Sequence, residues 1–403
     1  MPLPFRPLLT AALAATLFVS TTGLAAEQSA IWYQHTDINL PTNTTVASLN
    51  NGLRYIVLPT SRTSDEVSIR VRIGTDLEPA STQLMASRLL ANDTTAGNQW
   101  QASTDASQTV FSLDLDHANL SQLEQHLTQI KTALTQTPDS TENAEQTEAA
   151  QESDPQLLEA ITAFQQHYYQ PSNTSVIVAG GVKSREIIRL VRQQFSDWPS
   201  NRQQPINLVS KTAAMVDANT LRSDNAFALI AFKPLASATD SKQQRKDMLT
   251  ALLANKLIEQ RIADALEKQQ SLATVQVKND RLFQQQLMSQ IRVTGLPAND
   301  KDQAQQLVRK EIQRAAASGF TQAEYEMVVS QVRQELQRQT RLENQGYTRD
   351  QADRLVAALN QGIVYTDPSY DLDLLNFHVA HLTEFDISQA FERIWSPSNI
   401  REL

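Results

Sequence analysis

The sequence predicts an α+β protein built from two related domains. Short strand patterns alternate with amphipathic helices along most of the chain, and the same order of elements occurs in both halves. A short motif repeats with that order. Residues 169–173 (YQPSN) lie between a predicted helix and a predicted strand, and residues 395–399 (WSPSN) lie in the same setting 226 residues later. Proline followed by Ser-Asn is common in turns, so the motif alone is weak evidence for a repeat. Together with the shared order of elements, it favours two copies of one domain.

Composition narrows the classes of function. The chain has 403 residues, no cysteine, ten glycines and a formal net charge of −9. This length suits two to three domains. The lack of cysteine excludes a disulfide scaffold, a thiolate zinc site and a cysteine nucleophile. The acidic balance argues against nucleic acid as a partner, because a phosphate-binding face needs clustered Lys and Arg. Any chemistry would therefore use histidine and carboxylates.

The first 26 residues have the pattern of a secretory signal peptide. Arg6 precedes an apolar run over 8–19, and small residues at Ala25 and Ala26 precede the acidic Glu27. We expect cleavage after Ala26 and a periplasmic mature protein. No later stretch approaches eighteen apolar residues, so we expect no membrane span. Residues 27–47 are interpreted as an extended lead-in.

The first domain is assigned to residues 48–200. Strict alternation of apolar and polar residues over 67–73 predicts a half-buried strand, paired with a strand at 53–58. Residues 137–155 carry six acids and no base, so we interpret them as a flexible acidic loop. The other elements expected in this half are strands at 109–115 and 175–178 and helices at 84–90, 120–134, 157–168 and 184–195.

The second domain is assigned to residues 223–403, after a linker at 201–222. Its expected elements are strands at 226–232, 273–277 and 287–293 and helices at 242–266, 301–317, 350–359 and 387–395. Another helix is predicted to open with a capping box, Thr321 to Glu324. After Pro397-Ser398-Asn399 only four residues remain. We therefore expect the second sheet to stop at its last strand, through truncation of the domain or with its edge completed by a partner.

Several segments resemble the insulinase/pitrilysin-like zinc peptidases, the inverzincin family with the motif H-x-x-E-H. The resemblance lies in the run 51–54 leading into a strand, in 73–79 (IGTDLEP), in 164–198, and in 352–356 (ADRLV) running to Gly362. It covers most of 48–403 in the expected order. The fold that it implies is two related domains, each a mixed β-sheet with helices packed on one face.

The resemblance also implies where zinc would bind. In the family, two histidines four residues apart on one helix hold the metal, and a glutamate beside the second activates water. Alignment on Gly74 and Glu78 places Ser87, Leu90 and Ala91 at the His, Glu and His positions. Leucine and alanine have no donor atoms, and serine is a poor zinc ligand. The helix that carries the third ligand corresponds to the acidic segment 137–155. We therefore expect no metal or other cofactor.

The family's second domain supplies an Arg and a Tyr, seven residues apart, that hold substrate and stabilise the oxyanion. The matching positions here are Glu267 and Thr274. Glutamate reverses the charge offered to a developing oxyanion, and threonine lacks the reach of a phenol. We accordingly expect no catalytic residues at either set of positions.

One other group of residues could bind a metal. His378, His381 and Glu384 are spaced to share one face of a helix, with a polar surface stripe as the ordinary alternative.

These observations favour an exported, catalytically inactive homologue of the insulinase-like peptidases. It would bind an unstructured peptide or act as the non-catalytic subunit of an active insulinase-like peptidase, since family members often work as such pairs. One alternative is an active zinc peptidase whose ligands are displaced to His378, His381 and Glu384. Another is an envelope scaffold protein. Nucleic acid is not expected as a partner.

Overall fold

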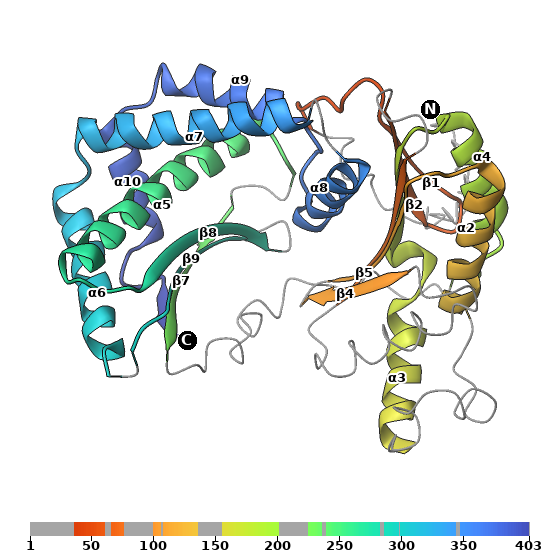
Figure 1. Ribbon diagram of the computed structural model, residues 1–403, viewed down its shortest axis with the longest axis horizontal. Helices are drawn as coiled ribbons and strands as arrows, with labels where there is room; N and C mark the ends of the chain where they lie inside the picture. The colour runs from red at the N-terminus through yellow and green to blue at the C-terminus, as the bar shows by residue number, and fades with distance from the viewer. Residues whose placement is uncertain are drawn as a thin grey trace, which may run out of the picture. The chain divides into compact units, whose positions relative to one another are not determined.

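The structure is a computed structural model. It describes residues 36–60, 66–75, 100–105, 108–135, 155–200, 225–235, 239–282, 286–297, 299–343 and 347–402. Residues 31–403 form one compact unit. Within the described residues, the strands form two sheets, one in each half of the sequence (Figure 1).

The sheet of the first half has six strands in the order β1-β2-β6-β3-β5-β4. Their bounds are β1 Thr45–Ser48, β2 Arg54–Pro59, β3 Val67–Gly74, β4 Gln101–Asp105, β5 Gln108–Leu115 and β6 Thr174–Gly180. Strands β2 and β6 run parallel, and the other neighbours are antiparallel. The sheet is therefore mixed, as the family resemblance implies.

The expected pairing of the strand at 67–73 with the strand at 53–58 is wrong. Strand β6 lies between them and pairs with both β2 and β3. All seven residues of β6 are buried, which suits a central strand rather than an edge. Gly180 ends this strand with φ 143°, and a Cβ there would lie 2.2 Å from the Glu66 carbonyl oxygen, so only glycine allows the two chains to approach so closely.

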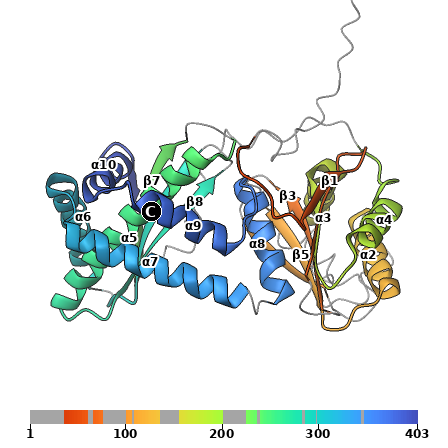
Figure 2. The same cartoon turned by 90° about the horizontal axis from the view of Figure 1, so that it is seen from above.

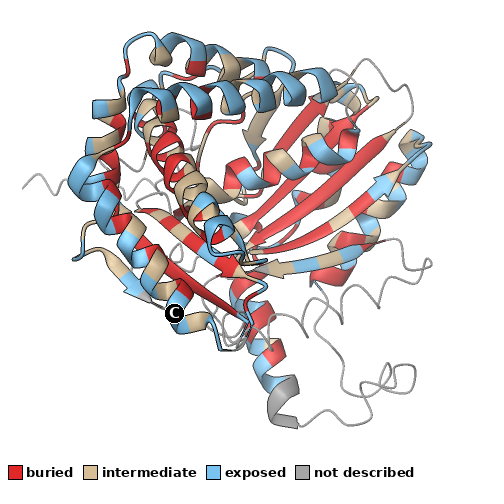
Figure 3. Cartoon of the chain, turned by 60° about the vertical axis from the view of Figure 1, so that its left-hand side comes forward, coloured by how far each residue is buried: buried red, intermediate tan, exposed pale blue. Residues whose placement is uncertain are grey.

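Helices cover both faces of this first sheet. On one face, α2 (Leu120–Thr135), α3 (Pro155–Tyr168) and α4 (Ser184–Phe195) bury their apolar sides with Val57, Val71 and Val178. On the other face lies α8 (Thr348–Gln361), a helix from the second half of the sequence. Consequently β3 is buried along Val67–Ile73 rather than half-buried, and Figure 3 colours such positions red.

The second sheet has four strands in the order β10-β7-β9-β8, all antiparallel. Its elements are β7 Ala226–Pro234, α5 Lys242–Lys268, β8 Thr274–Leu282, β9 Gln286–Thr294, α6 Lys301–Ser318, α7 Gln322–Glu343, α9 Pro368–Val379, α10 Glu384–Ile394 and β10 Ile400–Glu402. This order repeats β6-β3-β5-β4 of the first sheet with the same antiparallel pairings. The topology thus agrees with the internal repeat expected from the sequence.

Most predicted elements are present within a few residues of their expected bounds. Helix α9 and strands β1 and β4 were not predicted, and both strands are five residues or shorter. Strand β10 lies directly after Asn399, where the last strand of the second sheet was expected to begin. The predicted helix at 84–90 and the linker at 201–222 lie outside the described residues, as does the acidic segment up to residue 154. Over the part of the chain that the structure describes, no helix combines the length and hydropathy needed to cross a membrane.

The predicted capping box at the start of α7 is confirmed and is extended by a charge from α5. The Thr321 backbone N–H donates to Glu324 Oε2 at 2.7 Å, and the Glu324 N–H donates to Thr321 Oγ1 at 3.3 Å. Arg261 donates to both oxygens of the same carboxylate, at 2.6 and 2.8 Å. The Arg261 hydrogen bonds, helped by Thr321, lower the pKa of Glu324 to about 2.

We expect Glu324→Gln to destabilise the fold by roughly 2–3 kcal/mol at pH 7, since the ionised carboxylate is the stabilised form. A lowered pKa means that this stabilisation is present above about pH 4.5 and is lost as the pH falls towards about 2. Urea unfolding at pH 7 and pH 3 measures both effects, and the variant should change less between the two pH values than the parent. Glu335→Gln is the control, because the pKa of Glu335 is also lowered to about 2 but its partner Arg338 is exposed to solvent. Equal losses in the two variants would contradict the prediction.

Candidate functional site

The structure leaves the predicted zinc positions untested. Ser87, Leu90 and Ala91 lie outside the described residues, as do residues 137–154 of the acidic segment. Among the residues that are described, no group of three or more His, Cys, Asp or Glu side chains is arranged to hold a metal ion.

The two positions matched to the family's Arg and Tyr are both described. Glu267 lies in the last turn of α5, and Thr274 is the first residue of β8. Both residues are exposed. The Thr274 hydroxyl lies 3.0 Å from the hydroxyl of Thr294 on the neighbouring strand. A carboxylate and a hydroxyl already bonded within the sheet provide neither the cation nor the long phenol donor that would stabilise an oxyanion.

The expectation of a shared helical face for His378, His381 and Glu384 is wrong. Helix α9 ends at Val379, so His378 lies in its last turn and His381 in the turn that follows. Glu384 is the first residue of α10, where Thr383 forms the N-cap. The rings of both histidines stand edge-on to Phe377, with ring centroids 5.1 and 5.8 Å away. Burial, the charge of Lys246 and the neighbouring His381 lower the pKa of His378.

A cluster of polar side chains that the sequence did not single out lies between β3 and α8. Its members come from the polar positions of the alternating strand, Ser68, Arg70 and Arg72, which are 1%, 1% and 8% exposed. Ser68 and Thr348 are joined through their hydroxyls at 2.8 Å. Arg72 donates to Asn360 at 2.7 Å. Each polar position of the strand thus contacts the same helix.

Arg70 is the centre of this cluster. It donates through Nε to Asp353 at 2.6 Å and through Nη1 to Asp114 at 2.8 Å. Burial by itself would lower the pKa of Arg70, but the hydrogen bonds and charges of Asp353 and Asp114 raise it. A guanidinium held in its charged form between two carboxylates takes no part in proton transfer. We conclude that the cluster positions α8 on the sheet.

The residues that follow α8 are also held by buried charged groups, which lie at and just before α5. Asp240, two residues before the start of α5, is fully buried and accepts from the Val364 backbone N–H at 2.8 Å. Arg245 donates to Asp240 and to the Val364 carbonyl oxygen, at 2.8 and 2.5 Å. Helix α8 therefore contacts the first sheet through its side chains, and the residues that follow it are held by α5.

We expect Asp353→Asn to destabilise the protein by about 1–2 kcal/mol, because a neutral amide is a weaker acceptor for the buried Arg70. The expected destabilisation is modest because the Asp353 side chain is itself 56% exposed. Thermal and urea unfolding measure the change. Asp350→Asn, at an exposed position of the same helix, is the matched control and should cost less. If both variants unfolded like the parent, Asp353 would not hold α8 in place.

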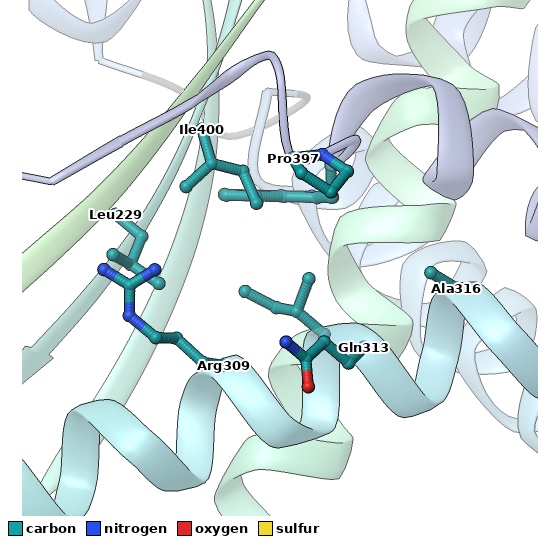
Figure 4. A pocket seen from close by; sticks show the side chains of 8 residues that line it. Leu229, Arg309, Gln313, Ala316, Pro397 and Ile400 are labelled. Carbon is teal, nitrogen blue, oxygen red and sulfur yellow. The ribbon is translucent and has the colours of Figure 1, made fainter.

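A cavity of ≈ 210 Å³ lies at the β10 side of the second sheet (Figure 4). It is lined by residues from β7, α6 and the segment around β10: Leu229, Arg309, Ile312, Gln313, Ala316, Trp395, Pro397 and Ile400. Arg309 is the one charged residue among these, and none of them is a carboxylate, a histidine or a hydroxyl-bearing nucleophile. The cavity suits binding rather than catalysis.

Comparison with known proteins assigns the fold. Residues 157–332 match the family model described as the peptidase M16 inactive domain. The structure is similar to the first half of the periplasmic protease PqqL from Escherichia coli, with a TM-score of 0.69 and 16% identity over 91% of this chain and 92% of that one. The chain has the fold of the insulinase-like peptidases.

Other solved structures share this fold. A predicted insulinase family protease from Yersinia pestis has a TM-score of 0.66 and 17% identity, over 88% of this chain and 90% of that one. The ferredoxin protease FusC, in complex with Arabidopsis ferredoxin, has a TM-score of 0.66 and 13% identity, over 89% of this chain but 47% of that one. Relative to the whole PqqL structure, the chain spans about half the length, 48%. No curated protein matches the sequence. At these identities the likeness establishes the fold.

Proposed function

We propose that this protein is an exported, catalytically inactive insulinase-like peptidase homologue that binds peptide or protein segments. The observation that carries the proposal is the lack of donor atoms at two of the three positions where the family's zinc motif aligns, Leu90 and Ala91. Without two imidazoles, no site of the family's geometry lowers the pKa of a bound water.

The second half supports the same proposal. Exposed Glu267 and hydrogen-bonded Thr274 stand where the family places an Arg and a Tyr. Without the zinc ligands, the oxyanion-stabilising pair would have no function. Replacement of both sets of residues therefore fits a chain that retains the fold and does not hydrolyse peptides. The matched family model is also described as an inactive domain.

Binding is the activity that such a fold retains. The related ferredoxin protease was solved with a protein, ferredoxin, bound to it. We propose that this chain likewise takes a peptide or protein segment, either alone or as the non-catalytic subunit beside an active insulinase-like peptidase.

The central test is zinc content and cleavage in the same sample. We expect purified protein dialysed against zinc to retain far less than one equivalent of metal and to leave a mixture of unstructured peptides uncut. Ser87→His/Ala91→His is the comparison variant, because two histidines four residues apart on a helix bind zinc. We expect it to gain zinc affinity by isothermal titration, which also tests the alignment.

Two outcomes would contradict the proposal. Zinc near one equivalent in the parent, with cleavage that a chelator stops, would establish an active peptidase; loss of that zinc in His378→Ala/His381→Ala would place the ligands there. Failure to bind any unstructured peptide or any H-x-x-E-H-bearing subunit would favour the envelope scaffold.

Export is tested separately. We expect the protein recovered from a periplasmic fraction to begin at Glu27, because the small residues Ala25 and Ala26 precede it in the arrangement that signal peptidase cleaves. N-terminal sequencing measures the start of the mature chain. An Arg6→Glu variant should accumulate uncleaved in the cytoplasm, whereas Arg54→Glu, in the mature chain, should be processed normally. Full-length protein in the cytoplasm of the parent strain would contradict export.

A further inference from the structure

Within the described residues, the first sheet presents three arginines on the side that α8 covers. Figure 2 shows α8 beside β3 and β5, and Ile177 of β6 packs in one core cluster with the helix. Arg70 pairs in register with Ile177. Arg72 and Arg54 both pair with Ser175, from the two strands on either side of it. Because paired residues of neighbouring strands point to the same side of a sheet, all three arginines point to the side of α8.

These arginines differ in their partners. Arg70 lies between two carboxylates, as described above. Arg72 donates to the side-chain oxygens of Gln108 and Asn360, at 2.8 and 2.7 Å. For Arg54, the described residues supply neither a hydrogen bond nor an ion pair to the guanidinium, and its Nε is buried without a partner. Arg54 therefore carries an uncompensated charge.

An uncompensated guanidinium is unfavourable at this position. Burial lowers the pKa of Arg54, and no carboxylate of the described residues opposes that effect. Arginine nevertheless stays protonated at pH 7, so the chain cannot remove the charge by releasing a proton. A charge withdrawn from water without a counter-charge destabilises the fold. Because Arg54 as a whole is partly exposed, an anion from solvent can reach it and supply the missing charge.

The residue beside Arg54 has a second unused donor. Ser175 is 0% exposed, and its Oγ has no hydrogen-bond partner. Neighbouring strands lie about 4.8 Å apart, so the side chains of Ser175 and Arg54 are adjacent on the same side of the sheet. Buried hydroxyls in native proteins nearly always have a partner. Two donors without acceptors at adjacent positions indicate a site for an acceptor that the described chain does not provide.

We propose that Arg54 and Ser175 bind a carboxylate group of a ligand. The planar guanidinium would donate two parallel hydrogen bonds to the carboxylate oxygens, and the serine hydroxyl would donate a third. One carboxylate neutralises one guanidinium, whereas a phosphate group carries about −1.5 to −2 charges and would leave the site negative. The carboxylate belongs to a peptide or to a small organic acid. The site does not depend on whether the chain cleaves peptides, since neither residue stands at a position matched to the family's catalytic residues.

The first test follows the Nε–Hε signal of Arg54 in the heteronuclear NMR spectrum of the complete mature chain, assigned by its loss in Arg54→Lys. Sodium acetate is the probe, exchanged for sodium chloride at constant ionic strength. We expect a saturable shift with a Kd of about 1–20 mM, as for a ligand that makes few contacts. Neutral acetamide should leave the signal in place, and sodium phosphate should bind at least about threefold more weakly. The signal of Arg189, an exposed arginine of α4, is the control and should not shift.

The second test identifies the residues through the unfolding temperature. Bound acetate should raise Tm, because a ligand that binds only the folded chain stabilises it. We expect Arg54→Gln to abolish this rise and Arg189→Gln to retain it. Ser175→Ala should weaken acetate binding by about threefold to tenfold, through loss of one hydrogen bond. Arg54→Lys keeps the charge without the planar fork and should retain only part of the rise.

A pair of blocked pentapeptides, with a central glutamate or a central glutamine, distinguishes the sources of the carboxylate. Tighter binding of the glutamate peptide than of acetate assigns the site to a peptide, and equal binding of the two assigns it to a small organic acid.

Three results would overturn the proposal. The first is an absence of a saturable shift in the parent chain up to about 100 mM acetate, beyond which binding is too weak to be specific. The second is an equal rise of Tm in Arg54→Gln and Arg189→Gln. The third is binding of acetamide as tight as that of acetate, because the site would then not recognise charge.

Discussion

The packing of the first sheet depends on how a buried arginine is neutralised. Arg70 points from the centre of β3 towards α8 and is 1% exposed. A buried charge is tolerated only when it is paired and hydrogen-bonded, and here Asp114 on the neighbouring strand and Asp353 on α8 supply both requirements. Because the second carboxylate lies 283 residues away in the sequence, the sheet can bury Arg70 only after the second half of the chain has placed α8 on it.

The apolar residues around Arg70 also join the first sheet to α8. One core cluster combines Ile56, Val110 and Ile177 of the sheet with Leu355 and Leu359 of α8. The residues after α8 are held by Asp240 and Arg245 of the second half. The two sequence halves therefore share a core, although each has its own sheet. A boundary at 201–222 separates the strands of the two sheets. Helix α8 lies after that boundary in the sequence but covers one face of the first sheet.

The described polar residues of this chain stabilise the fold. The polar side chains on α8 and β3 are committed to holding the structure, and Arg70 is kept charged between two acids. At the positions matched to the family's oxyanion-stabilising pair, Glu267 and Thr274 are exposed.

The sequence by itself determined the local elements, the repeat and the residue types at the positions expected to match the family's catalytic residues. Apolar periodicity placed α4 over 184–195 as observed, and the chemistry of Thr321 and Glu324 fixed the start of α7. Tertiary structure alone decided that β6 separates β2 from β3, that the polar side of β3 is buried, and that His378 and Glu384 lie on different helices. The physical reason is that periodicity along a strand reports which side is apolar. It does not report which distant segment will cover the polar side, since that depends on contacts between residues hundreds of positions apart.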